Sequence, residues 1–233
     1  MGQAPSPADP SSFYRVIPHD VMVFIFGTTL IVAIAALLGS VARQVAGVRN
    51  TSRAVVRRAL RSIMTLEYLS SGGVGCTYPD ARHSMARRWF HHCTYYGFLL
   101  CFASTSIAAI YHVVFGWRAP YAYSSAPVVL GTIGGVGLMV GPLGLLALRR
   151  RRDPHMTDPA QRGLDESFIV MLCMTSVTGL LLLGFREQPA MPALLVVHLG
   201  FVLGLFLTLP YGKFVHGLYR MAALLRFSAE AHR

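Results

Sequence analysis

The chain has 233 residues, of which 54% are hydrophobic and only 13% are charged, and its formal net charge is +11. Soluble globular domains carry roughly a quarter charged residues, so this composition excludes an ordinary soluble protein and indicates one that lies in lipid. A basic excess can also indicate nucleic acid binding, so the position of the 21 basic residues has to distinguish the two environments.

Long charge-free intervals predict the fold. They lie between Asp20 and Arg43, Arg88 and Arg118, Arg118 and Arg149, Glu166 and Arg186, and Glu187 and Lys213. A bilayer core needs about 20 apolar residues per helix. We therefore expect an all-α integral membrane protein, a five-helix transmembrane bundle with spans near 21–42, 89–115, 124–148, 167–185 and 191–216. The bundle occupies 21–220, between an N-terminal tail over 1–20 and a C-terminal tail over 221–233.

The basic residues predict the orientation. Segment 43–88 holds nine arginines, segment 149–166 five, and the tail from 211 four basic residues, whereas the other side keeps only Arg15, Arg118 and Arg186. By the positive-inside rule, loop 43–88 and the C-terminus are cytoplasmic and the N-terminus is periplasmic in a bacterial inner membrane. Nucleic acid is then not expected as a partner.

Three shorter patterns predict packing and surface features. Arginines and apolar residues in helical spacing over 43–70 predict an amphipathic helix that lies on the membrane surface or docks a partner. The glycine-rich stretch 70–80 lacks the ending of a phosphate loop and predicts a structured turn. Gly131/Gly135 and Gly137/Gly141 predict close helix packing. The scattered cysteines 76, 93, 101 and 173 predict neither a zinc site nor an iron–sulfur cluster on this chain.

Histidines on two predicted spans are the candidate functional residues. They are His91, His92 and His112 on the second span and His198 and His216 on the fifth. Ionisable side chains in a membrane are costly, which marks them as functional candidates. His198 and His216 are 18 residues apart, five whole turns, so one continuous helix would present both on one face. His91 lies within roughly 60° of the face of His112, and His92 faces nearly the opposite way.

The second and fifth spans run antiparallel, since three crossings separate them. His91 or His92 is therefore level with His216, and His112 is level with His198. Two histidine pairs at two depths are the ligands that two bis-histidine haems require. The alternative is that these histidines only hydrogen-bond neighbouring helices. His19, His83, His155 and His232 fall in predicted loops or tails and receive no role.

Five segments resemble the membrane half of the tricarballylate utilisation protein B (CitB/TcuB) family. They are residues 13–23 (Phe-Tyr-Arg-Val-Ile-Pro-His-Asp-Val-Met-Val), 75–80 (Gly-Cys-Thr-Tyr-Pro-Asp), 87–92 (Arg-Arg-Trp-Phe-His-His), 96–103 (Tyr-Gly-Phe-Leu-Leu-Cys-Phe-Ala) and 209–217 (Leu-Pro-Tyr-Gly-Lys-Phe-Val-His-Gly). The resemblance covers most of 13–227. The layout is also similar to the two-haem gamma subunits of respiratory nitrate reductases, whose haem-ligating histidines correspond to His91 or His92, His112, His198 and His216.

The resemblance implies a cytochrome b-type electron-transfer subunit with one or two haems b, rather than a stand-alone enzyme. Its expected partners are a cytoplasmic flavoprotein dehydrogenase, which converts tricarballylate to cis-aconitate, an iron–sulfur protein or segment, and the membrane quinone. Family members carry an N-terminal ferredoxin-like part, so we expect the clusters on a missing N-terminal part or on a partner. Lys213, Arg186 and Glu187 are candidate contacts for quinone or haem propionates, although interfacial snorkelling also explains them.

Two other functions stay open from the residues alone. The first is a small transporter. Against it, no acidic residue lies within a predicted span and no inverted repeat is evident. A haem-free membrane anchor would recruit a dehydrogenase through the arginine-rich segment 43–88, and its histidines would be dispensable.

Overall fold

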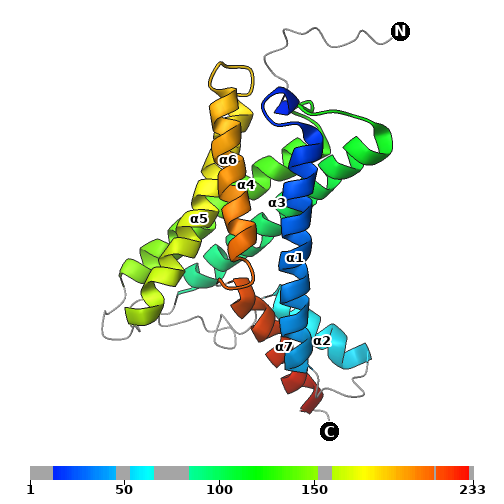
Figure 1. Ribbon diagram of the computed structural model, residues 1–233. Helices are drawn as coiled ribbons and strands as arrows, with labels where there is room; N and C mark the ends of the chain where they lie inside the picture. The colour runs from blue at the N-terminus through cyan, green and yellow to red at the C-terminus, as the bar shows by residue number, and fades with distance from the viewer. Residues whose placement is uncertain (1–12, 46–52, 66–83, 152–158, 213, 231–233) are drawn as a thin grey trace.

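The computed structural model describes residues 13–45, 53–65, 84–151, 159–212 and 214–230, and within these helices a few side chains, including that of His216, lie outside the description. A short 3-10 turn, η1 (Phe13–Arg15), precedes seven α-helices in the described chain (Figure 1). These are α1 (His19–Val45), α2 (Arg53–Met64), α3 (Ala86–Phe115), α4 (Ala126–Arg150), α5 (Pro159–Gly184), α6 (Met191–Thr208) and α7 (Phe214–Glu230).

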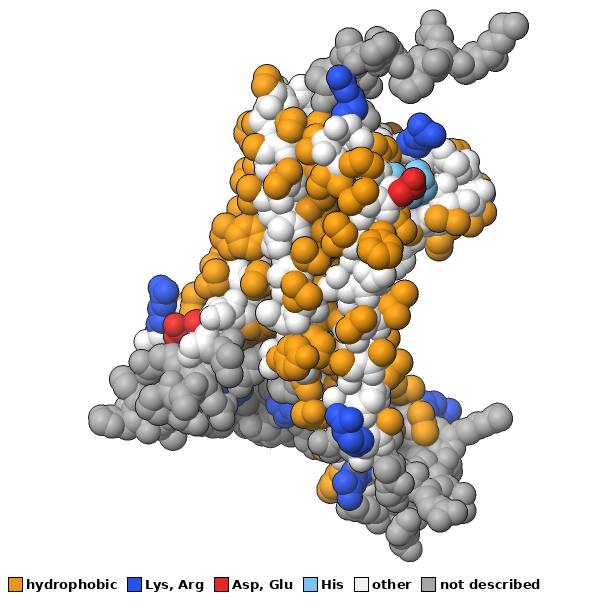
Figure 2. All heavy atoms as spheres, in the orientation of Figure 1, with side chains coloured by type: hydrophobic (Ala, Val, Ile, Leu, Met, Phe, Trp, Pro, Cys, Tyr) orange, Lys and Arg blue, Asp and Glu red, His pale blue; other side chains and the backbone are white. Residues whose placement is uncertain are grey.

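Five of the described helices are long and apolar enough to cross a membrane, which confirms the number of spans. The segments are His19–Arg43, Ala86–Phe115, Ala126–Arg150, Glu166–Gly184 and Met191–Thr208. Large apolar side chains cover the outside of the bundle, with basic side chains at its two ends (Figure 2). Phe24 and Val113, for example, are 71% and 79% exposed. Outward apolar surface on this scale suits lipid rather than water, so the chain has the architecture of a multi-pass membrane protein.

The fifth predicted span, 191–216, is wrong at its end. Helix α6 stops at Thr208, a turn follows over 209–212, and α7 begins at Phe214. Pro210 accounts for the break, because proline has no backbone N–H and its ring clashes with the carbonyl four residues earlier. His198 and His216 therefore lie on different helices, and their 18-residue spacing no longer places them on one face.

Helix packing follows a nearly sequential order. α3 packs on α4, α4 on α5 and α5 on α6, while α1 packs on α6 and α7, and α2 on α7. A buried cluster of Leu138, Leu172 and Leu205 joins α4, α5 and α6, with Phe98 and Cys101 of α3 against it. A second cluster joins Ala33 and Leu37 of α1 to Leu209 and Val215 around the break after α6.

Glycines bring α3 and α4 into backbone contact, as the spacing in the third span predicts. A Cβ added at Gly134 would lie 2.8 Å from the Cys101 backbone nitrogen, and one added at Gly141 would lie 2.6 Å from that of Thr94. No larger residue fits at either position without separating the helices. Gly135 serves the other side of α4, where its carbonyl accepts a hydrogen bond from the Ser176 hydroxyl of α5.

The bundle has two distinct ends. The loop end comprises η1, the α3–α4 connection over 116–125 and the α5–α6 connection over 185–190, which contact one another. The basic end comprises α2, the start of α3, and α7. The predicted helix directions in the membrane, and the assignment of the loop end to the periplasm, stay predictions.

The segment over 43–70 contains a helix, as predicted, since α2 has four arginines and no acidic residue within Arg53–Met64. Three residues of α3 bind the end of this helix. The Tyr96 hydroxyl donates to the Met64 carbonyl at 2.9 Å, Arg88 donates to the Thr65 carbonyl, and the Tyr95 hydroxyl contacts the Met64 sulfur. The predicted turn over 70–80 and the first twelve residues of the N-terminal tail lie outside the described residues.

Candidate functional site

A pair of stacked imidazoles lies at the loop end. His19, the first residue of α1, and His112, near the end of α3, have ring centroids 3.7 Å apart and planes inclined by 25°. Tyr14 of η1 contacts both rings, at 5.2 Å from His19 and 5.8 Å from His112. The pair therefore joins the first span to the second in the described structure.

Local sequence explains why these two histidines meet. Pro18 precedes α1, and its carbonyl accepts the Met22 N–H, so the helix begins directly at His19. Gly116 ends α3 with φ of +68°, and its N–H donates to the His112 carbonyl. A left-handed residue there suits glycine and turns the chain back over the end of α3.

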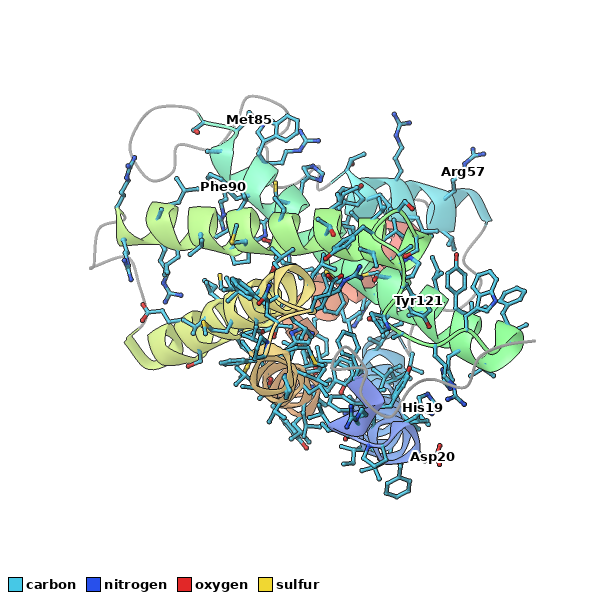
Figure 3. All side chains as sticks on the ribbon, turned by 90° about the horizontal axis from the view of Figure 1, so that it is seen from above. His19, Asp20, Arg57, Met85, Phe90 and Tyr121 are labelled. Atoms are coloured by element: carbon cyan, nitrogen blue, oxygen red, sulfur yellow. The ribbon has the colours of Figure 1, made fainter. Side chains whose placement is uncertain are left out.

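The sequence-based assignment missed His19. It fell in the predicted tail over 1–20, two residues before the expected start of the first span. Its Nδ1 lies 3.5 Å from Oδ1 of Asp20, whose side chain is exposed. Figure 3 shows Asp20 at the rim of the bundle beside His19. The Ile-Pro-His-Asp sequence was the available signal, because proline followed by a polar residue commonly marks a helix start.

Two imidazole nitrogens lack partners in the described structure. Nδ1 of His92 and Nδ1 of His112 are both inaccessible to solvent and make no hydrogen bond within the described residues. Buried polar atoms are nearly always hydrogen-bonded, so an unpartnered one calls for an explanation. At the basic end, the His92 ring stacks on Tyr96 with centroids 5.6 Å apart and planes inclined by 10°.

His198 lies in the interior of α6 and faces α5. Its Nδ1 is 3.1 Å from the hydroxyl oxygen of Thr178, which is 4% exposed. A Cβ added at Gly179 would lie 2.9 Å from Cε1 of the same imidazole. The ring therefore lies directly against the α5 backbone.

The described contacts of the predicted ligands do not test the predicted pairs. His112 contacts His19, and His198 contacts α5. His91 and His92 lie in the first two turns of α3 at the basic end, where α7 also begins, but the side chain of His216 lies outside the described residues. Both pairings, His112 with His198 and His91 or His92 with His216, stay predictions.

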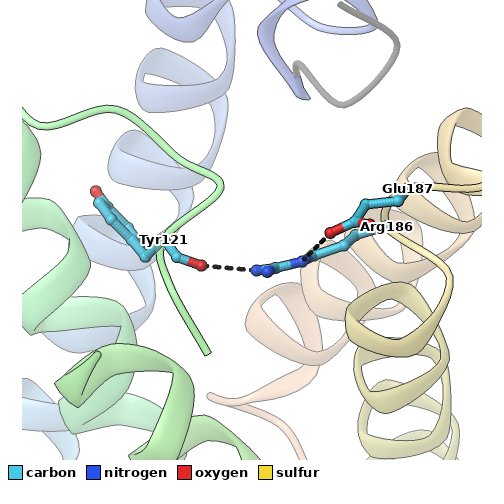
Figure 4. A network of polar contacts seen from close by, with 3 residues as sticks. All are labelled: Tyr121, Arg186 and Glu187. Carbon is cyan, nitrogen blue, oxygen red and sulfur yellow. Dashed lines mark hydrogen bonds and ion pairs between the residues drawn. The ribbon is translucent and has the colours of Figure 1, made fainter. Parts of the chain in front are cut away.

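Arg186 connects two loops at the loop end (Figure 4). It is 8% exposed, donates to the Tyr121 carbonyl at 2.6 Å and lies 3.6 Å from the centre of the Tyr123 ring. Its Nε is 3.8 Å from Glu187, which is largely exposed. Arg186 is thus a buried contact rather than a snorkelling side chain. Lys213, the third predicted quinone or propionate contact, lies outside the described residues.

Tyrosines complete the loop end. Burial raises the pKa of Tyr14, while a hydrogen bond from the Ala119 backbone and the charge of Arg118 oppose the increase. Burial, with smaller effects of Tyr14 and Tyr111, also raises the pKa of Tyr121. The Tyr121 hydroxyl donates to the Ala108 carbonyl at 3.1 Å. Both phenols therefore stay protonated at neutral pH, and that of Tyr121 acts as a hydrogen-bond donor.

The described residues contain no group of three or more His, Cys, Asp or Glu side chains that converges as a directly bound metal ion would require. A site built from paired histidines has only two protein ligands per iron and needs no such group. The histidines therefore have to be considered as pairs of ligands rather than as members of a cluster around one metal ion.

Comparisons with known proteins identify relatives. The family model described as "CitB: Citrate utilization protein B" matches residues 4–233. The citrate utilization protein B of Escherichia coli is 45% identical over 225 residues, which cover 95% of this chain and 59% of that protein. The chain thus spans under two thirds of the length of this relative. No solved structure matches the chain. On these matches, the chain belongs to the citrate utilization protein B (CitB) family.

Proposed function

We propose that the chain is a haem-binding, cytochrome b-type membrane subunit that passes electrons from a cytoplasmic dehydrogenase to the quinone pool. The proposal rests on family membership, on five helices able to span a membrane and on the imidazoles within them. The relative is named for citrate utilization. We accordingly propose that the donor is a flavin- and iron–sulfur-dependent dehydrogenase of a tricarboxylate such as tricarballylate.

The buried, unpartnered ring nitrogens of His92 and His112 carry this proposal. The His92 ring also interacts with the Thr65 backbone, so His112 carries the greater part of the argument. An unmet buried polar atom costs about 1–3 kcal/mol, so a histidine that merely joined two helices would have a partner for it. A group supplied from outside the chain accounts for both rings, either as iron at one ring nitrogen or as a hydrogen-bond acceptor at the other. Neutral imidazole in an apolar helical bundle suits haem iron, so these residues fit the cofactor.

The proposed ligands are His112 with His198 near the loop end, and His91 or His92 with His216 at the basic end. Haem, when bound, supplies reversible one-electron transfer. The chain holds the ligand rings in place and excludes water with apolar side chains. Arg186, Glu187 and Lys213 are proposed to contact propionates or quinone. His19 competes with His198 as the partner of His112, since its ring already contacts His112.

The basic end is proposed to face the cytoplasm of a bacterial inner membrane. Four arginines of α2 lie there, and the positive-inside rule places such segments on the cytoplasmic side. The same surface has the charge to attract an acidic donor protein. Iron–sulfur clusters are proposed to belong to a partner or to a part of the protein outside this chain.

A haem assay on the purified full chain tests the proposal. We expect one or two haems per polypeptide by pyridine haemochromogen, with a redox-active Soret band that His112→Ala weakens. His155→Ala serves as a matched control, because His155 falls between α4 and α5 in the sequence. A folded, haem-free protein would contradict the proposal. Dehydrogenase recruitment without haem would then favour the membrane-anchor function.

A further inference from the structure

The contact between His198 and α5 selects one nitrogen of the imidazole. We infer that Thr178 and Gly179 are positioning residues that hold His198 with a proton on Nδ1 and a free lone pair on Nε2, so that Nε2 is the ligating atom. This inference rests on the proposed function, since the ligated group is the proposed haem. It concerns residues on a helix without any proposed ligand.

The hydrogen-bond geometry of Thr178 fixes the direction of its contact with His198. The Thr178 hydroxyl has one hydrogen, and its Oγ1 lies 2.6 Å from the Met174 carbonyl and 3.2 Å from the Thr175 carbonyl. A carbonyl oxygen only accepts, so the hydroxyl hydrogen is committed to the backbone. At its 3.1 Å contact with Nδ1, Oγ1 must therefore accept.

The tautomer of His198 follows from that direction. If Oγ1 accepts, then Nδ1 carries the hydrogen, and a neutral imidazole keeps its lone pair on Nε2. Metal-ligating histidines commonly donate their second ring N–H to a fixed acceptor, which orients the ring and makes it a stronger ligand.

Gly179 fixes the position of the same ring. An added Cβ would lie 2.9 Å from Cε1, 3.3 Å from Nδ1 and 3.6 Å from Nε2. Any side chain at 179 therefore pushes the imidazole away from α5 and lengthens the bond to Thr178. Consecutive residues of one helix thus control the proton position and the location of the ring.

Substitutions at 178 and 179 separate these roles. Thr178→Val keeps the shape and removes the acceptor, Thr178→Ser restores it, and Gly179→Ala displaces the ring. Thr132→Val is a matched control, because the Thr132 hydroxyl donates to the Val128 carbonyl of α4. Gly184→Ala is the second control, because nothing lies within 4 Å of a Cβ added there.

The readouts on purified full-length protein are haem content, the electron paramagnetic resonance spectrum of the oxidised haem and its midpoint potential. We expect Thr178→Val to retain haem but to raise the midpoint potential and shift the spectrum, because the ligand becomes less basic. Thr178→Ser should return both toward wild type. Gly179→Ala should lower haem affinity by about tenfold. Both controls should match wild type.

The results that overturn the inference are distinct from those that overturn the proposed function. If His198→Ala loses a haem while Thr178→Val and Gly179→Ala match wild type, then Thr178 and Gly179 do not position the ligand. If the wild-type chain binds no haem, the proposed function fails, and the inferred ligation fails with it. In that case nitrogen-15 NMR of histidine-labelled protein still reports the tautomer of His198, and a proton on Nε2 would overturn the assignment directly.

Discussion

Helix α3 has two halves that contact the rest of the bundle in different ways. From Phe90 to Ser104 it lies against α4, where glycines allow backbone contact and Ser104 donates to the Pro127 carbonyl. From Thr105 to Phe115 it extends past the start of α4 and meets the loop end. There the contacts are made by rings, including Tyr111 on Trp117 at 4.9 Å and His112 on His19 at 3.7 Å.

The difference shows which part of α3 can hold a cofactor. The glycine half has no space between backbones and sets the position of α3 in the bundle. The ring half contacts η1, α1 and Tyr121 through side chains, which can change rotamer without moving a helix. A ligand at His112 would thus be held by a helix whose position is fixed by the glycine half, while the side chains around it can change rotamer.

The largest expected effect is loss of the folded bundle when the glycine half is altered. Gly141→Leu places a Cβ only 2.6 Å from the Thr94 backbone nitrogen. Overpacking of this kind costs about 1–3 kcal/mol or more of stability. We expect poor yield and a lower melting temperature by size-exclusion thermal assay. Gly27→Leu on α1, where nothing lies within 4 Å, should behave as wild type.

Substitution in the ring half should affect cofactor content more than folding. We expect His112→Ala to remove roughly one of the two proposed haems, because a bis-histidine site fails without either ligand. Double variants identify its partner. The histidine that shares this haem loses it as a single variant and adds no further loss to His112→Ala, whereas a histidine that ligates nothing shows no loss as a single variant. Comparing His19→Ala and His198→Ala, each alone and each combined with His112→Ala, by haemochromogen assay therefore distinguishes His19 from His198.

A smaller effect is expected at the loop that covers the ring half. Arg186→Met removes a charged hydrogen bond to the Tyr121 carbonyl, worth about 1.5–3 kcal/mol, and leaves that carbonyl unmet. We expect a lower melting temperature and, through loss of the proposed propionate contact, a haem content no higher than that of wild type. Glu187→Gln is the comparison, since an exposed ion pair contributes about 0–1 kcal/mol. Equal stability of the two variants would show that Arg186 is not a structural contact.

The smallest effect is a pH dependence from Tyr14. Because burial raises its pKa, the folded protein holds the phenolic proton more tightly than the unfolded chain does. The resulting stability is complete below the unfolded pKa of about 10 and is lost as pH rises through the folded value. The melting temperature of wild type should therefore fall relative to that of Tyr14→Phe above about pH 10. A constant difference across that range would contradict this assignment.

Much of the fold could be predicted from sequence because lipid imposes simple rules. Charge-free intervals gave five spans, and glycine spacing predicted the α3–α4 contact. Absence of charge up to Lys213 predicts a helix that is too long, because Pro210 marks the break. A span needs only enough apolar length to cross, and the 18 residues of α6 already suffice.

The candidate site was less predictable. His112 and His198 were identified because ionisable residues in spans are unusual, but a pattern along single helices does not show how helices lie across one another. The His19–His112 contact depends on where α1 begins and on the turn at Gly116. The Thr178–His198 contact joins helices through a threonine that, in sequence, is an ordinary residue of an apolar span.

The break after α6 has a mechanical consequence. Leu209 and Val215, on either side of it, are buried against Ala33 and Leu37 of α1, so the corner is held rather than loose. The corner between α6 and α7 is therefore held in place by contacts with α1. His198 lies on α6, and α7 belongs to the basic end. The position of α6, and with it that of His198, is thereby coupled to α7 and α1 through buried contacts.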